Sequence, residues 1–150
     1  MYSKAGGTIT GAVNINSSLT TTGNAFIGGD VYANYSDSRL KNFTGTIENS
    51  LDKVKSLSGY LFTENEVAKQ HGFDNDDQQV GVSAQEVQAV LPEAVALAPF
   101  DRDAETGVSK SGEDYLTVQY EKLVPLLIEA IKEQSATIET LTKRLEKLEG

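Results

Sequence analysis

The first 35 residues alternate apolar and polar side chains over short stretches that glycines interrupt. Alternation with a period of two predicts β-strands, because successive side chains of a strand point to opposite faces of its sheet. The predicted strands cover residues 8–10, 13–15, 25–27 and 30–32. None of them carries enough apolar surface to fold alone. The segment is therefore either a disordered linker or, the reading favoured here, one third of an intertwined fibre whose core other chains complete.

After about residue 35 the pattern changes to that of an ordinary globular sequence. Residues 49–59 predict a short helix with one apolar face, capped by Asn49 or Ser50 and ended by Gly59. Residues 60–63 predict a strand. The polar, acidic stretch 64–78 predicts an exposed loop.

A second helix is marked by its cap. Residues 79–82 predict a strand, and Ser83 with Glu86 three positions later matches a capping box. The helix that follows is expected to end before Pro92. Residues 94–97 and 115–118 predict two further strands that flank a glycine-containing loop, 99–114, and pair as an antiparallel hairpin.

The last thirty residues predict a long helix, residues 119–149, with Pro125 in its first turn. Apolar residues recur in it with a seven-residue period, which predicts a coiled-coil seam of about three and a half heptads. One set of seam positions is Val124, Ile131, Ile138 and Leu145, and the other is Leu127, Gln134, Leu141 and Leu148. The alternative is a single amphipathic helix packed on its own domain, which residues 121–131 are expected to be. The narrower stripe beyond residue 132 predicts self-association, of a stoichiometry that the seam leaves open because Gln134 is polar.

Composition narrows the functional classes. The chain has no cysteine, which excludes disulfides and thiolate metal sites, and a single histidine, His71, which excludes multi-histidine metal sites. The formal net charge of −9 disfavours binding to nucleic acid and to anionic membranes. No apolar run approaches the ~20 residues of a membrane span. We expect no metal, no cofactor, no nucleic acid partner and no membrane.

The strongest candidate for chemistry is Ser36 with Lys41, five residues apart at the boundary between the two compositions. A serine hydroxyl needs a base to become a nucleophile, and a desolvated lysine amine is such a base. The nearest carbonyl is that of Tyr35, so attack would give an ester that water opens, leaving Ser36 as a new N-terminus. The alternative is that Ser36 caps a turn and Lys41 is a surface charge, since this spacing is common.

The other candidates are weaker. Residues 74–79 and 101–107 resemble calcium-binding loops, but each lacks the glycine required at the sixth position. Glu64 and Glu66 form a carboxylate pair in a stretch expected to be solvated. His71 is expected to be an ordinary loop residue.

Three motifs in order resemble a known family. Ser36-Asp37-Ser38-Arg39-Leu40-Lys41 is similar to the opening motif of the intramolecular chaperone domain of endosialidases and phage tail fibres. Residues 80–87, followed by 91–95, resemble its second signature, and residues 120–132 its third. The resemblance covers about residues 36–149.

The resemblance implies a function that the spacing alone did not. Family members form homotrimers, guide three upstream chains into a β-helical or β-prism fibre, and then cut themselves off. Here the cut would be at the Tyr35–Ser36 bond, with Ser36 as nucleophile, Lys41 as base, and Asp37 and Arg39 in orienting or oxyanion roles. The family's helical regions would correspond to residues 49–58, 84–91 and 120–148.

Together these expectations describe an α+β protein in two parts. Residues 1–35 would be the end of a β-rich tail fibre or tailspike shaft, which is the folding client. Residues 36–150 would be a small mixed domain with short strands and helices and a long C-terminal helix, acting as a self-cleaving serine peptidase on its own chain. Assembly would take place in the cytoplasm of a bacterial host, with the shaft kept in the virion. The alternatives are a fibre tip that stays attached, or one that binds a receptor or glycan through loops 64–78 and 99–114.

Overall fold

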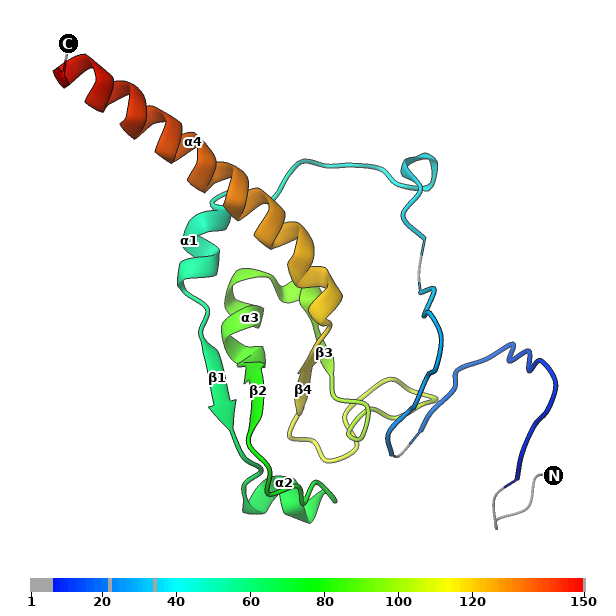
Figure 1. Cartoon of the computed structure of the whole chain (residues 1–150). Coiled ribbons are helices and arrows are strands. Elements are labelled where there is room, and N and C mark those ends of the chain that lie inside the picture. Colours follow the sequence, from blue (N-terminus) through cyan, green and yellow to red (C-terminus); the bar gives the residue numbers. More distant parts are fainter. Residues whose placement is uncertain (1–6, 22, 34, 150) are drawn as a thin grey trace. The chain divides into compact units, whose positions relative to one another are not determined.

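The computed structural model describes residues 7–21, 23–33 and 35–149 (Figure 1). The chain divides into two units, Met1–Leu40 and Lys41–Gly150. Each unit is described by itself below. No helix in the described ranges is both long enough and apolar enough to cross a membrane.

The described part of the first unit contains no strand, so the four strands predicted for residues 8–32 do not form in the single chain. Its apolar side chains are exposed, including Phe26 (92%) and Tyr32 (92%). A strand acquires its backbone hydrogen bonds only from a neighbouring strand, and these short stretches have no such neighbour within one chain. The one regular element among the described residues of this unit is a 3₁₀ helix, η1, Ser38–Leu40.

The second unit is a small α+β domain that ends in a long helix (Figure 1), as the sequence pattern predicts. Its helices are α1 (Ser50–Lys55), α2 (Glu66–Gln70), α3 (Ala84–Val90) and α4 (Leu123–Glu149). Its strands are β1 (Gly59–Phe62), β2 (Gln79–Val82), β3 (Val95–Leu97) and β4 (Leu116–Val118). Two 3₁₀ helices, η2 (Pro92–Ala94) and η3 (Tyr120–Lys122), precede β3 and α4.

The strands form two separate antiparallel pairs. β1 pairs with β2, with Leu61 opposite Val80. β3 pairs with β4, with Ala96 opposite Thr117, which confirms the predicted hairpin. Helix α2, within the stretch predicted as loop, was missed. It is one turn long and carries no apolar face, and it forms because the Asn65 side chain accepts a hydrogen bond from the Ala68 N–H (3.0 Å).

The fully buried apolar core of the described residues is small and comes from α3, η2, the residue that follows β3, and the first half of α4. Its members are Val87, Ala94, Ala98, Leu126 and Ala130. Leu126 and Ala130 lie one turn apart on α4, so the first half of this helix buries a stripe against the domain. The second half extends past the other elements of the unit (Figure 1).

Glu133 of α4 caps α1, which neither Asn49 nor Ser50 caps with its side chain. Its two carboxylate oxygens accept hydrogen bonds from the backbone N–H groups of Ser50 (2.8 Å) and Leu51 (2.9 Å). Asn49 precedes the helix in the left-handed region (φ 53°), and its side chain makes no cap hydrogen bond. The buried Ser50 hydroxyl donates to the Ile47 carbonyl (2.6 Å) instead. A residue 83 positions away therefore supplies the cap that we expected from the local sequence.

The predicted capping box at α3 is half confirmed. The Ser83 hydroxyl accepts a hydrogen bond from the Glu86 N–H (3.4 Å), as a cap residue does. The Glu86 carboxylate, however, accepts hydrogen bonds from the Ser58 N–H (2.9 Å) and the Tyr60 hydroxyl. Glu86 thereby fastens the beginning of β1 to α3.

Candidate functional site

The motif of residues 36–41 contains one well-defined polar arrangement, between Asp37 and Arg39. Asp37 Oδ1 accepts hydrogen bonds from the Arg39 backbone N–H (2.9 Å) and from Arg39 Nε (3.0 Å). Asp37 Oδ2 accepts from Arg39 Nη2 (2.6 Å), which completes a bidentate ion pair. The Leu40 N–H donates to the Asp37 carbonyl (3.1 Å) and closes the turn of η1. Asp37 therefore holds both the backbone turn and the guanidinium of Arg39.

The ion pair shifts both groups in the direction of their charged forms. Hydrogen bonds from the Arg39 side chain, and then from its backbone, lower the pKa of Asp37 below its usual 3.8. The same hydrogen bond raises the pKa of Arg39. Because the Arg39 side chain is 86% exposed, solvent and salt screen this ion pair. The pair therefore orients the Arg39 guanidinium and contributes little to the free energy of folding.

The residues predicted to be the nucleophile and to flank the cut are accessible to solvent. Tyr35 is 63% exposed, and Ser36 is exposed as well, in backbone that belongs to no regular element. Attacking serine and hydrolytic water would both need this accessibility. The neighbouring turn of η1 begins two residues downstream of Ser36.

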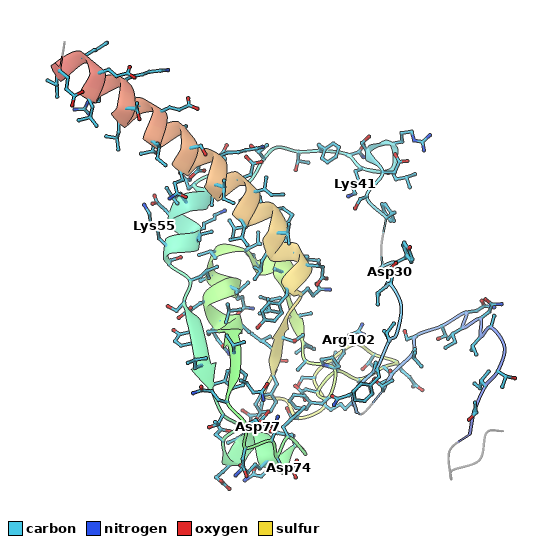
Figure 2. All side chains as sticks on the ribbon, in the orientation of Figure 1. Asp30, Lys41, Lys55, Asp74, Asp77 and Arg102 are labelled. Atoms are coloured by element: carbon cyan, nitrogen blue, oxygen red, sulfur yellow. The ribbon has the colours of Figure 1, made fainter. Side chains whose placement is uncertain are left out.

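The predicted base, Lys41, is the first residue of the second unit and is exposed (Figure 2). A lysine amine in water is protonated at pH 7, so a base role requires an environment that removes water from it. The described surroundings of Lys41 within its own unit do not bury it. The pairing of Ser36 with Lys41 stays a prediction, since the two residues belong to different units.

The second and third motifs form much of the folded core of the second unit. Residues 80–87 form β2, the Ser83 cap and the first turns of α3, and include the buried Val87. Residues 91–95 form η2, and 120–132 form η3 and the buried half of α4. These motifs contain Val87, Ala94, Leu126 and Ala130, so they supply most of the buried apolar core found in the described residues.

The acidic stretch 101–105 has a structural use that explains its resemblance to a metal loop. Asp101 is 1% exposed, and its carboxylate accepts hydrogen bonds from the Ser109 hydroxyl (2.7 Å), the Ser111 N–H (2.8 Å) and the Tyr115 N–H (3.1 Å). Burial alone would raise the pKa of Asp101, but these hydrogen bonds outweigh it and lower the pKa to about 2. Asp101 thus folds the loop that joins β3 to β4.

Asp103 organises the tip of the same loop. Its Oδ1 accepts hydrogen bonds from the Thr106 N–H (2.7 Å) and hydroxyl (2.8 Å) and from the Glu105 N–H (3.1 Å). Gly107 then takes a positive φ of 74°, which a residue with a side chain adopts at a cost. Among the residues that the structure describes, no three His, Asp or Glu side chains gather as metal ligands would.

An aromatic cluster joins the two loops that the sequence treats separately. The His71 ring lies 4.9 Å from that of Phe100 and 5.0 Å from that of Tyr115. Phe73 adds an edge contact to Phe100 at 5.3 Å. Sequence reasoning assigned His71 to an ordinary loop and missed this cluster, because its members come from positions 71–73, 100 and 115. The cluster packs the end of α2 against the β3–β4 loop.

Comparison with known proteins identifies the domain. Residues 36–96 match a peptidase family model described as chaperone of endosialidase. The long tail fibre protein Gp37 of Enterobacteria phage K3 is 39% identical over 110 residues, covering 73% of this chain and 8% of that protein. The protein of the same name from Enterobacteria phage T2 is 39% identical over 110 residues, covering 73% of this chain and 7% of that protein. The one from Salmonella phage S16 is 26% identical over 136 residues, covering 87% of this chain and 17% of that protein.

The chain thus spans less than a tenth of the phage K3 and T2 proteins that it matches. The family match begins at Ser36, the first residue of the motif that contains the Asp37–Arg39 pair. It continues through α1, β1, β2, α3 and η2 into β3, and it includes Val87 and Ala94 of the buried core. Residues 36–96 of this chain are therefore similar to the chaperone-of-endosialidase family, which the motif at residues 36–41 also resembles.

Proposed function

We propose that this chain is the intramolecular chaperone of a phage tail fibre or tailspike and that it releases itself by autoproteolysis at the Tyr35–Ser36 bond. The observation that carries the proposal is the start of the family match at Ser36, where the polar, glycine-rich segment ends. The relatives named as long tail fibre proteins place such a domain in a fibre protein. The client would be the upstream segment of the same polypeptide, in a virion protein assembled in the cytoplasm of the bacterial host.

The proposed cut is an acyl shift followed by hydrolysis. Lys41, as the neutral amine, takes the proton of the Ser36 hydroxyl while Ser36 Oγ attacks the carbonyl carbon of Tyr35. The C–N bond breaks, the Ser36 nitrogen receives the proton from Lys41, and an ester joins Tyr35 to Ser36 Oγ. Water then opens the ester, which leaves a carboxylate on Tyr35 and a free amino group on Ser36. Arg39, held by Asp37, is positioned to stabilise negative charge that develops near the motif.

Self-association through α4 is part of the proposal. The predicted seam is exposed along the helix, including Ile131 (61%), Ile138 (56%) and Leu145 (58%). An apolar stripe of this length on a helix that leaves its domain is typical of a coiled-coil partner surface. We propose that three copies associate here, as the family resemblance implies.

Trimerisation explains how the domain would help its client. A fibre of intertwined strands has contacts that lie between chains or far apart in sequence, so it nucleates slowly. Joining three chains at one end raises their effective concentration. When the chaperone domain is cut off after folding, an unfolded fibre could no longer refold. The fibre would then persist because it unfolds slowly, which is kinetic stability.

The exposure of Lys41 supports a second candidate, a fibre tip that assembles the same way but stays attached. The two candidates differ in one observable. Autoproteolysis produces a fragment that begins with Ser36, whereas a permanent tip keeps the Tyr35–Ser36 bond. A tip that binds a receptor or glycan would bind with the mature fibre, which a discarded chaperone does not.

Mass spectrometry of the purified protein and of Ser36→Ala tests the proposal. We expect the parent to yield a fragment starting at Ser36, and Ser36→Ala and Lys41→Ala to remain full-length. Lys53→Ala is the matched control, since it removes another lysine and should leave cleavage unchanged. An intact parent would support the permanent tip, and normal processing of Ser36→Ala would overturn the serine assignment.

A further inference from the structure

A groove of about 480 Å³ lies along β4 and is bounded on its other side by Val82 of β2 and the first residues of α3. Glu113 and Asp114 form one rim and Tyr120 lies at the other end. Asp101, through Ser109, Ser111 and Tyr115, holds the loop that carries this acidic rim. One wall of the groove is therefore β4 together with the loop that Asp101 holds in place.

The backbone of β4 has N–H and C=O groups that bond to no other residue in the described part of the chain. The Ala98 N–H donates to the Tyr115 carbonyl (2.7 Å), and the Gln119 N–H donates to the Ala94 carbonyl (2.8 Å). Alternate residues of a strand point their backbone groups to the same side, so Thr117 also faces β3. The backbone N–H and C=O groups of Leu116 and Val118 consequently point away from β3, toward the groove.

The β2 wall is oriented in the same way. The Val82 N–H donates to the Tyr120 hydroxyl (3.3 Å), which lies beyond the end of β4 rather than on β1. The Val82 N–H therefore points away from β1 and toward Tyr120, the second residue after β4. The edge of β4, with Val82 of β2 across the groove, forms a site for an added strand.

The chain itself supplies a strand-like segment without a partner. Residues 30–33 alternate polar and apolar side chains, and in the single chain Val31 (67%) and Tyr32 (92%) are exposed. This exposure leaves them available to a second copy. A three- to five-residue addition to β4 is the length that the groove wall offers.

Charge sets the direction of the added strand. If the added strand runs antiparallel to β4, its C-terminal end leaves the groove at Glu113 and Asp114. The residues that follow it, 37–41, carry one net positive charge, from Asp37, Arg39 and Lys41. A parallel strand would instead place Asp30 at the acidic rim. Repulsion disfavours the parallel arrangement and attraction favours the antiparallel one.

From these observations we propose that the β4 groove binds residues 30–33 of a second copy as an antiparallel strand, delivering the motif of one copy to the Glu113–Asp114 rim of another. The inference rests on the proposed self-association and names the docking site of the segment to be cut. It also gives the folding client a direct contact with the chaperone, by which a correctly placed fibre end would be recognised.

Disulfide mapping tests the docking, because the chain has no cysteine of its own. In the full-length Ser36→Ala chain, Thr117→Cys is combined in turn with Val31→Cys, Tyr32→Cys and Ala33→Cys. We expect at least one pair to form covalent dimers and higher species, about tenfold more than the same partner with Val108→Cys, which lies outside the groove. Adding Glu113→Gln and Asp114→Asn should lower the yield by about threefold or more.

Three results separate the possibilities. Yields equal to the Val108→Cys control, in variants whose circular dichroism matches the parent, overturn the docking site. Loss of thiols without a change in chain mass overturns the second copy as occupant, since the link then lies within one chain. The proposed autoproteolysis is judged separately by the N-terminus of the unmodified protein, so either idea can fail while the other stands.

Discussion

At the scale of single residues, Asp37 is the side chain that holds the motif of residues 36–41 in its observed conformation. Its carboxylate accepts four hydrogen bonds from Arg39 at 2.6–3.1 Å, while its carbonyl closes η1. A side chain that positions another acts on catalysis through geometry. Asp37 is therefore a positioning residue in the proposed reaction, and Arg39 the group that it positions.

Replacing Asp37 should slow cleavage without changing assembly. We expect Asp37→Ala to reduce the rate of Tyr35–Ser36 cleavage by about 10- to 100-fold, because Arg39 loses its orientation. The native mass should be unchanged. A time course of processing by mass spectrometry measures the rate, with Asp52→Ala as control for loss of an exposed aspartate. Parent-like cleavage in Asp37→Ala would remove Asp37 from the reaction.

Asp101 predicts a pH dependence of stability. Its pKa is about 2 in the folded protein against 3.8 for the ordinary group. Because the folded pKa is the lower one, the stabilisation is present above about pH 4 and is lost as the pH falls toward 2. Thermal unfolding followed by circular dichroism at pH 5, 3 and 2 should show this decline. The decline should be smaller in Asp101→Asn, and an equal decline would assign it to other carboxylates.

At the scale of elements, the contact of α4 with α1 shows what local sequence reasoning misses. The helix 49–59 was predicted correctly in type, but it is shorter, Ser50–Lys55. Its cap comes from Glu133, which no window around residue 50 contains. β1, β2, α3 and the β3–β4 hairpin were predicted close to their observed bounds, since their apolar periodicity and the Ser83 cap are local signals.

Removing the distant cap should destabilise the domain. We expect Glu133→Ala to lower the free energy of unfolding by about 1–2 kcal/mol, because two N–H groups of α1 lose their acceptor. Glu133→Gln, which keeps one acceptor oxygen, should lose less. Urea unfolding measures both, with the exposed Glu139→Ala as control. A control-sized effect of Glu133→Ala would show that water replaces the cap.

At the scale of the whole molecule, the exposed seam of α4 is the surface on which the proposed self-association rests. Within the described residues α4 buries only Leu126 and Ala130 fully, while the seam side chains remain open to solvent. Burying one such isoleucine in a helix–helix contact contributes about 1.5–3 kcal/mol for each copy. A single charge in the seam should therefore prevent association.

If copies associate through the seam as proposed, Ile138→Asp should leave the protein monomeric, as native mass spectrometry or light scattering would show. Glu139→Lys, on the next position of the same helix, is the control and should remain assembled. If the proposed dyad forms only within the assembly, Ile138→Asp should also stop cleavage. A cleaving monomer would contradict that requirement.

The sequence by itself determined the α+β class, most element positions, the seam and the motif of residues 36–41, because periodicity, caps and short motifs are local properties. Only the tertiary structure decided that Glu133 caps α1, that Glu86 ties β1 to α3, and that His71 meets Phe100 and Tyr115. It also decided that Asp101 binds backbone N–H groups and that β4 presents an open edge to a groove. These features join residues that the fold alone brings within hydrogen-bond or van der Waals distance, and no spacing along the chain records them.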